Sequence, residues 1–244
     1  MKESKQDEYY LKKEGNNYFQ RNISKTDIPE IRDTKKIILD EIKESGILFN
    51  KVLEYGCNYG DLLYYMKNKN GVQECIGVEA SDEAITFGEK LYSDSISFVN
   101  GTIANNKIND NPKFQNYFDL IIIDDVFGWV SRETLFQSMS NIDNTLKDGG
   151  FIFLRDFYSD KRTKNKNHHV SDESVFNYKL PESHASMLLA SGIYEIEWQK
   201  IFYDKVGKVV NKPYKSDNPF NYRWADIILK KSYNEYFTES KKIE

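Results

Sequence analysis

Val52-Leu-Glu-Tyr-Gly-Cys-Asn-Tyr-Gly-Asp61 decides the fold, because it has the pattern of a buried strand that runs into a glycine turn and then into a helix. Gly56 and Gly60 allow the backbone to approach a ligand closely and to take positive φ, and the helix that follows supplies free N–H groups. Glu79 ends the next apolar run, 19 positions after Gly60. Since a carboxylate at that place can accept hydrogen bonds from both hydroxyls of a ribose, the stretch predicts a nucleoside site.

The glycine pattern differs from that of a dinucleotide-binding turn. The dinucleotide fingerprint has glycines at its first, third and sixth positions, and counting from Gly56 the later two positions hold Asn58 and Asp61. Glu54, just before the turn, would repel a pyrophosphate and attract a cationic amino or sulfonium group. The turn therefore favours a nucleoside that carries a positive group over one that carries phosphates.

Short apolar runs alternate with helical stretches along the chain. The runs are 51–55, 75–79, 118–123 and 150–154, with a weaker one at 97–100, and the helical stretches include 61–67, 82–91 and 131–146. Continuous apolar strands are typical of a sheet covered on both faces, and strand–helix–strand repetition implies right-handed crossovers. After a helix expected to open at Pro181, residues 194–202 and 223–229 indicate a terminal antiparallel pair. We expect an α/β fold with a doubly wound, mostly parallel sheet.

Composition limits the class of protein. Of the 244 residues, 39% are hydrophobic and 30% are charged, which is typical of a globular protein. No apolar run approaches the ~20 residues of a membrane helix, and the polar residues 1–8 lack a secretory core. We therefore expect a cytoplasmic protein with no membrane partner. The 2 cysteines disfavour a disulfide framework or a multi-cysteine zinc site, and the net charge of −4 gives no support to nucleic-acid binding.

Four ordered motifs resemble those of class I S-adenosylmethionine-dependent methyltransferases. They are Glu-x-Gly-Cys-x-x-Gly at 54–60, Gly-Val-Glu-Ala-Ser at 77–81, Phe-Asp-Leu-Ile-Ile-Ile-Asp-Asp-Val at 118–126 and Leu-Lys-Asp-Gly-Gly-Phe at 146–151. The resemblance implies that family's Rossmann-like, seven-stranded sheet. It also implies S-adenosyl-L-methionine as the cofactor and S-adenosyl-L-homocysteine as its product.

The resemblance further implies roles for residues of the glycine turn. Gly56, Cys57 and Gly60 would line the methionine and ribose side of the cofactor, and Glu54 would lie near its amino group. We expect Cys57 to be a small packing residue rather than a reactive thiol, because the sequence reveals no base that would activate it.

Residues after the next strands would complete the cofactor site by the same resemblance. Glu79 would hold the ribose hydroxyls and Ala80 would touch the adenine. Thr102, followed by Ile103, occupies the place where the family often has an Asp for the adenine amino group, so the sequence departs from the pattern there. Asp124, at the end of the fourth strand, would face the transferred methyl group together with its neighbour Asp125.

Five residues are candidates for catalysis. Methyl transfer from a sulfonium depends largely on positioning, and a base is needed only if the acceptor must lose a proton. His168 and His169 lie in a basic loop, and His184 lies near the start of the helix after Pro181. Histidine is a candidate base because imidazole in general, with an unperturbed pKa of about 6.5, changes its charge near neutral pH. Asp125 and Asp156 follow strands that end at the expected cleft. The alternatives are exposed loop histidines, a packing histidine and strand-end caps.

Two specialised branches of the fold are disfavoured. Catechol-type, metal-dependent members have an acid after the fourth strand and an Asp-Asn pair after the fifth, whereas this chain has Asp156-Phe157 at the second place. Since hard cations need several oxygen ligands, we expect no metal. Nucleic-acid amino-methyltransferases have an Asn/Asp-Pro-Pro-Tyr/Phe run where this chain has Asp124-Asp-Val-Phe127, without proline.

The N-terminal segment carries a narrower resemblance. Tyr18-Phe-Gln-Arg21-Asn is similar to a stretch in small bacterial methyltransferases of surface-polysaccharide and sugar modification, in which the segment folds over the cofactor as a lid. The similarity implies that Tyr18 and Arg21 contact cofactor or acceptor. The alternative is an amphipathic helix whose Tyr18 packs on the core.

We expect an N-terminal helical lid segment over 1–45, a methyltransferase domain over 46–232 and a polar tail over 233–244. Residues 158–180 and 204–222 would be acceptor-side loops, and the basic run 161–169 is either a solvated face or a grip for a phosphorylated acceptor. The expected function is methyl transfer to a small molecule, namely a sugar or a nucleotide-linked precursor of surface polysaccharide. Protein or RNA methylation and cofactor binding without catalysis are the alternatives, and the aromatic loops would seal either a cleft or a homodimer interface.

Overall fold

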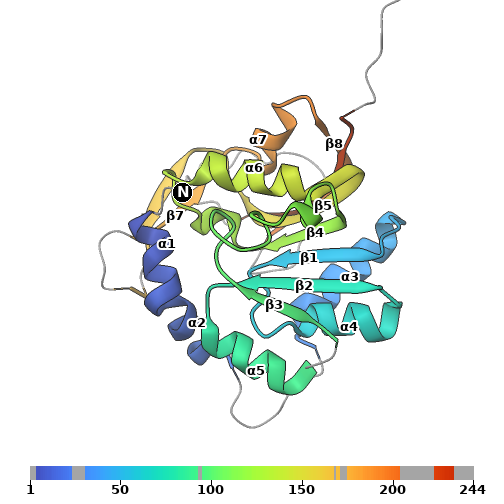
Figure 1. Cartoon of the computed structure of the whole chain (residues 1–244). Helices are drawn as coiled ribbons and strands as arrows, with labels where there is room; N and C mark the ends of the chain where they lie inside the picture. Colours follow the sequence, from blue (N-terminus) through green and yellow to red (C-terminus); the bar gives the residue numbers. More distant parts are fainter. Residues whose placement is uncertain are drawn as a thin grey trace, which may run out of the picture.

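The computed structural model describes residues 4–23, 31–92, 95–167, 169–170, 175–203 and 223–233. Its centre is a seven-stranded sheet in the order β3-β2-β1-β4-β5-β9-β8 (Figure 1). The strands are β1 Lys51–Tyr55, β2 Glu74–Glu79, β3 Ser97–Asn100, β4 Phe118–Asp124, β5 Leu146–Tyr158, β8 Tyr194–Tyr203 and β9 Arg223–Lys231. The first five strands in this order, from β3 to β5 across the sheet, run parallel to one another. β9 lies between β5 and β8 and is antiparallel to both. The predicted doubly wound, Rossmann-like sheet with its terminal antiparallel pair is confirmed.

Helices cover both faces of the sheet. α3 Asp33–Ser45, α4 Asp61–Asn70 and α5 Asp82–Tyr92 pack on one face, and α6 Leu135–Thr145 and α7 Ala185–Leu189 pack on the other. β4 serves both cores because side chains alternate along a strand: Ile121 and Ile123 face one core, and Leu120 and Ile122 face the other. A strand buried on both sides must be apolar throughout, which explains the continuous run at 118–123.

Helix α3 brings charged side chains to the sheet. Ile38, Leu39 and Ile42 recur at helical spacing and form its buried face. Lys35 and Glu41 fall on the same face and are also buried. The helix therefore packs through apolar contacts in its middle and through two charged groups near its ends.

The N-terminal segment lies beyond the carboxyl ends of the parallel strands (Figure 1). It consists of α1 Lys5–Tyr9, a π-helical turn η1 Tyr10–Glu14 and α2 Gly15–Asn22. The backbone of Gly15 packs on the turn after β2, where a Cβ on Gly15 would lie 2.9 Å from the Ser81 nitrogen. The segment is helical as predicted, while its action as a lid stays a prediction.

Residues 158–180, predicted to be a hydrophilic loop, contain an antiparallel hairpin of β6 Thr163–Lys166 and β7 Phe176–Lys179. Lysine ammonium groups lie over aromatic rings here, as Lys164 Nζ does at 3.7 Å from the centroid of the Phe176 ring. The lysine stems thus cover the apolar surface that a hairpin needs, and the polar composition conceals the strands.

The helix predicted to open at Pro181 begins only at Ala185, because Glu182 and Ser183 take positive φ values of 57° and 68°. The predicted loop 204–222, and the tail apart from Tyr233, lie outside the described residues. Within the ranges that are described, no helix is long and apolar enough to cross a membrane.

Candidate functional site

The glycine turn joins β1 to α4 at the carboxyl end of the sheet. Gly56, Asn58 and Gly60 have φ values of 73°, 54° and 81°, a region that favours glycine. The Gly56 N–H donates to the Val78 carbonyl at 2.8 Å, and a Cβ on Gly56 would lie 2.4 Å from Val126 Cγ2. Both backbone conformation and space therefore require glycine at position 56.

Cys57 points away from the open side of the turn. Its sulfur packs beneath Gly77, where a Cβ would lie 2.4 Å from Cys57 Sγ. The side chain is fully buried, and burial raises the pKa of its thiol well above the usual range. These contacts support packing, and the thiol stays protonated at neutral pH.

Hydrogen-bond acceptors surround the turn. Glu79 Oε2 accepts the Asn58 N–H at 2.8 Å, and Glu79 Oε1 accepts the Ser81 N–H at 2.9 Å. Glu54 Oε2 and Asn58 Oδ1 are buried with no hydrogen-bond partner among the described residues. Since buried acceptors without donors are costly, this cradle fits a ligand that presents amino and hydroxyl donors. It does not fit a pyrophosphate.

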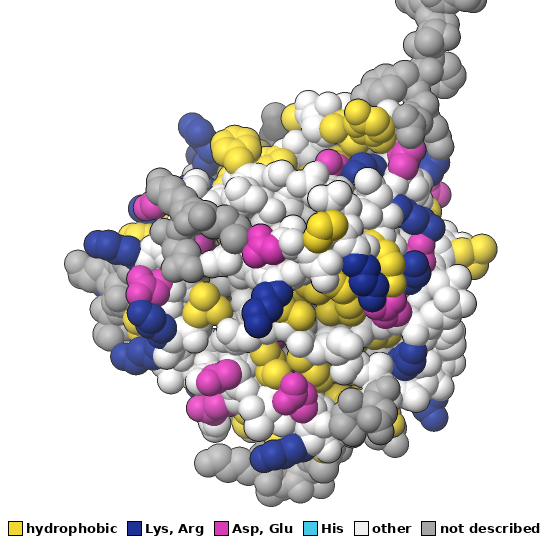
Figure 2. All heavy atoms as spheres, in the orientation of Figure 1, with side chains coloured by type: hydrophobic (Ala, Val, Ile, Leu, Met, Phe, Trp, Pro, Cys, Tyr) yellow, Lys and Arg dark blue, Asp and Glu magenta, His cyan; other side chains and the backbone are white. Residues whose placement is uncertain are grey.

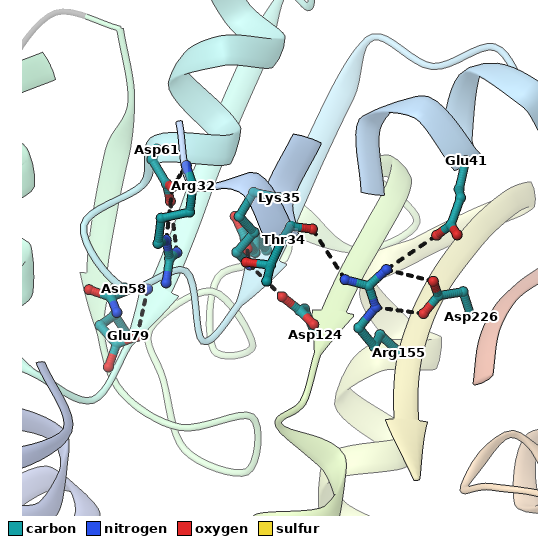
Figure 3. Close-up of polar contacts among 11 residues, drawn as sticks. Arg32, Thr34, Lys35, Glu41, Asn58, Asp61, Glu79, Asp124, Arg155 and Asp226 are labelled. Atoms are coloured by element: carbon teal, nitrogen blue, oxygen red, sulfur yellow. Dashed lines mark hydrogen bonds and ion pairs between the residues drawn. The ribbon is translucent and has the colours of Figure 1, made fainter. Parts of the chain in front are cut away.

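Lys35 lies between the ends of β1 and β4 (Figure 3). Its Nζ is 2.6 Å from Glu54 Oε1 and 2.9 Å from Asp124 Oδ2. Burial alone would lower the pKa of Lys35, but the carboxylates of Asp124 and Glu54 raise it above its usual value. Burial likewise would raise the pKa of Asp124, yet Lys35 and Arg155 hold it below its usual range. The ammonium group therefore neutralises part of an acidic site.

Two arginines form ion pairs on either side of Lys35 (Figure 3). Arg32 forms a bidentate pair with Asp61, with Nε to Oδ2 at 2.9 Å and Nη2 to Oδ1 at 2.8 Å. Arg155 donates from Nε to Asp226 Oδ1 at 2.6 Å, and its Nη1 donates to the Thr34 carbonyl at 3.2 Å. Bidentate pairs are geometrically specific, so the start of α3 is fixed to α4 and to β5.

Sequence reasoning missed Lys35, Arg155 and Asp226, although each left a signal. Lys35 stands three and four positions before Ile38 and Leu39, on the apolar face of a helix. Asp226 is a single charge inside an apolar strand run, and Arg155 directly follows the apolar run 151–154. Charges at buried positions are almost always paired, so these residues could have been proposed as ion-pair partners.

The adenine-side candidates gather beside Glu79. The Gly101 N–H donates to the Glu79 carbonyl at 2.9 Å, and the Thr102 N–H donates to the Asn105 carbonyl at 2.9 Å. The neighbouring Ala80 is half-buried, and Ile103 is buried. The structure thus brings the turn after β3 against the end of β2, and contact of these residues with adenine stays a prediction.

The lid candidates lie on α2. Arg21 Nη2 pairs with the buried Glu14 at 2.6 Å. Tyr18 is 50% exposed. Loss of hydration around its hydroxyl, and then the charge of Asp125, raise the pKa of Tyr18, and Asp124 acts in the same direction. Tyr18 therefore lies within electrostatic range of the carboxylates at the end of β4, whereas Arg21 forms an ion pair with Glu14 of the same N-terminal segment.

Two of the catalytic candidates meet in the interior. His184 and Asp156 are both fully buried, and His184 Nδ1 contacts Asp156 Oδ2. The other ring nitrogen, Nε2, lies 3.4 Å from Arg132 Nη1. His169 is exposed, and its backbone N–H donates to Asn167 Oδ1 at 2.9 Å. His168 lies outside the described residues.

Asp125 is the catalytic candidate that lies on the turn directly after β4. It follows β4 with a positive φ of 55°, and its N–H donates to the Arg155 carbonyl at 2.9 Å. Its charge acts on both Tyr10 and Tyr18. A carboxylate and two phenols thus gather where the N-terminal segment meets the end of β4.

One face of the molecule carries mixed charge. On the face drawn in Figure 2, basic and acidic side chains are interspersed, with apolar side chains visible between them. Among the residues that the structure places, no three His, Cys, Asp or Glu side chains are grouped so that they could hold a metal ion.

Comparisons with known proteins agree with this geometry. A family model described as a methyltransferase domain matches residues 52–150, from the first residues of β1 into β5. An uncharacterized protein of Rickettsia prowazekii is 27% identical over 104 residues, and the match spans 43% of this chain and 41% of that protein. This chain therefore matches less than half the length of that curated relative.

Solved structures share the fold. A 1,6-didemethyltoxoflavin-N1-methyltransferase of Burkholderia thailandensis, solved with 1,6-didemethyltoxoflavin and S-adenosylhomocysteine, superposes with a TM-score of 0.62 at 13% identity, covering 95% of this chain and 92% of that one. An S-adenosylmethionine-dependent methyltransferase of Clostridium acetobutylicum superposes with a TM-score of 0.54 at 14% identity, covering 89% and 96%. Residues 52–150 therefore match a methyltransferase domain, and the whole chain shares the fold of these S-adenosylmethionine-dependent methyltransferases.

Proposed function

We propose that this protein transfers the methyl group of S-adenosylmethionine to a small-molecule acceptor, and that the acceptor is a sugar or a nucleotide-linked precursor of surface polysaccharide. The observation that carries the cofactor part is the cradle of acceptors around the glycine turn. Glu54 Oε2 and Asn58 Oδ1 lack donors among the described residues, and half-buried Glu79 lies beside them. An amino group and ribose hydroxyls supply the donors that these oxygens need.

The chain's own residues divide the work of binding. Glu79 would receive the ribose hydroxyls and Glu54 Oε2 would receive the amino group, while Lys35 holds the other oxygen of Glu54 in place. When bound, S-adenosylmethionine supplies an electrophilic methyl group on a sulfonium. Asp124 keeps its negative charge beside Lys35 and favours the cationic ligand at the end of β4.

Asp125 serves the acceptor side in this proposal. The Asp125 carboxylate would accept the proton of a hydroxyl acceptor, and the cofactor would supply the methyl group. Tyr10 and Tyr18, whose pKa values respond to the charge of Asp125, would orient the acceptor. In the toxoflavin enzyme the acceptor is likewise a small molecule, which supports a small acceptor here.

Calorimetric titration tests the cofactor part. Wild-type protein should bind S-adenosylmethionine and S-adenosylhomocysteine with micromolar affinity and should not bind NAD. The Glu79→Ala variant should bind S-adenosylmethionine and S-adenosylhomocysteine much more weakly, because it loses the contacts with the ribose hydroxyls. Glu89→Ala, which removes an exposed carboxylate from the same helix–strand unit, is the matched control and should bind as wild type does. A preference for NAD would refute the proposal.

Turnover assays separate the remaining functions. The Asp125→Asn variant should keep cofactor affinity and lose methyl transfer to small hydroxyl acceptors. Methyl incorporation into protein or RNA would support the macromolecular alternative instead. Tight cofactor binding without turnover on any metabolite extract would support a non-catalytic binding protein.

A further inference from the structure

A pocket of about 400 Å³ opens between the β6–β7 hairpin and the segment after η3 Phe127–Trp129. Its described lining contains four cationic side chains and no carboxylate; the residues are Arg132, Arg162, Thr163, Lys164, Tyr178, Lys179 and Leu180. The volume lies within the range of small-molecule sites. In a chain whose net charge is −4, a concave site lined by one sign of charge attracts an oppositely charged ligand.

Aromatic faces hold three of these cations. Arg132 lies 4.3 Å from the centroid of the Tyr178 ring, and Lys179 Nζ lies 3.8 Å from that of Phe157. Lys164 Nζ lies over the Phe176 ring. Cation–π contacts fix a cation without neutralising it. Aromatic rings therefore hold the charges of Arg132 and Lys164 at the pocket.

Arg132 is held in place by the buried His184–Asp156 pair. Asp156 accepts from Nδ1 of His184, so the tautomer that these partners favour leaves Nε2 as an acceptor facing Arg132 Nη1 at 3.4 Å. Arg132 Nη2 also donates to the Val130 carbonyl at 2.9 Å, and its Nε is buried without a hydrogen-bond partner among the described residues. With both ring nitrogens engaged, His184 is a positioning residue for Arg132.

The pocket is connected to the end of the sheet. Asp156 follows Arg155, which is the β5 partner of Asp124 in β4. A Cβ on Gly128, three residues after Asp125, would lie 3.2 Å from Asp156 Oδ1. The series of contacts from Asp156 through His184 to Arg132 thus connects the strand ends with the cationic lining. Asp125, the proposed proton acceptor, lies at those strand ends.

We propose that this pocket binds a diphosphate group and, resting on the proposed function, that the group belongs to the methyl acceptor. The pocket of about 400 Å³ has four cationic residues in its lining and is larger than one phosphate requires, and guanidinium groups match phosphate oxygens geometrically. The acceptor is then a compound linked to a nucleoside diphosphate or carrying a pyrophosphate ester.

Inorganic pyrophosphate is the probe, titrated calorimetrically into the full-length protein at low and at physiological salt. The double variant Arg162→Gln/Lys164→Gln removes two exposed lining charges and should lose about ten- to hundredfold in pyrophosphate affinity. Its matched control is Lys161→Gln/Lys166→Gln, which removes two exposed charges from the same hairpin region outside the lining. The control should lose less than about threefold.

S-adenosylhomocysteine is titrated into the same variants. Retained cofactor affinity with lost pyrophosphate affinity supports the pocket. Cofactor binding without any pyrophosphate binding to wild type, or equal losses in variant and control, overturns the pocket and leaves the methyltransferase proposal standing. An RNA oligonucleotide that binds more tightly than pyrophosphate and displaces it would also overturn it.

The positioning role is tested with His184→Gln. This variant should weaken pyrophosphate binding about tenfold while cofactor affinity stays unchanged, because only Arg132 is released. Parallel losses of cofactor affinity and pyrophosphate affinity would mean that His184 merely supports the fold. Arg132→Lys, which keeps the charge but not the planar fork, should show the same selective loss.

Discussion

Replacing Lys35 by Met is the sharpest test of the charge arrangement at the cleft. The Lys35 side chain is 4% exposed, and its ammonium group is shared between Glu54 and Asp124. Methionine is unbranched and adaptable and fills similar space. The substitution therefore removes the charge and leaves the buried carboxylate of Glu54 and the partly buried carboxylate of Asp124 without their common partner.

The expected loss is about 3–5 kcal/mol of unfolding free energy at neutral pH, the usual cost of removing one partner of a buried ion pair. Lys36→Met is the control: Lys36 is 54% exposed and faces Asp33 across 3.1 Å, and an exposed pair contributes about 0.5 kcal/mol or less. The two lysines are neighbours in α3, so the difference between the variants reports burial.

The pH dependence has a definite sign. Burial raises the pKa of Glu54, and Lys35 opposes that rise; without Lys35 the folded-state pKa values of Glu54 and Asp124 should both move upward. An acid whose folded pKa is raised contributes stability at low pH that is lost as pH rises. The deficit of Lys35→Met should therefore be largest near pH 8 and smaller near pH 5.

Urea unfolding followed by circular dichroism at pH 5 and pH 8 gives both quantities. Adding Glu54→Gln to Lys35→Met should recover part of the loss at pH 8, since one of the unpaired carboxylates is gone. The reasoning is refuted if Lys35→Met and Lys36→Met differ by less than about 1 kcal/mol, or if the deficit grows as the pH falls.

Two further predictions concern α3 and the glycine turn. Burial, and then the neighbouring Asp226, raise the pKa of Glu41 to about 8. The unfolding free energy should therefore fall between pH 5 and 8, by at most about 1.4 kcal/mol per pH unit. The Glu41→Gln variant should show a weaker pH dependence in thermal melts, and an unchanged dependence would contradict the prediction. Gly56→Ala should destabilise more than Gly71→Ala in urea unfolding, because φ is 73° and 72° at the two positions but only the Gly56 Cβ meets a side chain, Val126. Backbone strain should cost each variant about 1–2 kcal/mol. Equal losses of unfolding free energy in the two variants would mean that the Val126 side chain moves aside without cost.

Much of the fold followed from local patterns. β1 and β3 have the predicted bounds, and β2 and β4 each extend one residue beyond them. Apolar runs of this length are determined by burial on both faces, which is a local requirement on each strand. The hairpin at 158–180 escaped prediction because lysine stems and aromatic rings cover each other there, a pairing that hydropathy does not register.

The site divides in the same way. The glycine turn, Glu79 and the acids after β4 were visible in the sequence because each directly follows or ends an apolar strand run, and that placement can be recognised from a few neighbouring residues. The contact between His184 and Asp156 could not be predicted from the sequence, because the two residues lie 28 positions apart and meet only in the folded protein.

By itself the sequence determined the strands, the helices between them and the glycine turn, since each depends on residues near one another in the chain. Tertiary structure alone decided that Lys35 comes between Glu54 and Asp124 and that Arg155 meets Asp226. It also decided that the cations of a polar hairpin gather with Arg132 around one pocket. Ion pairs between distant segments depend on which side chains the packed sheet brings within a few ångströms, and no local pattern encodes that distance.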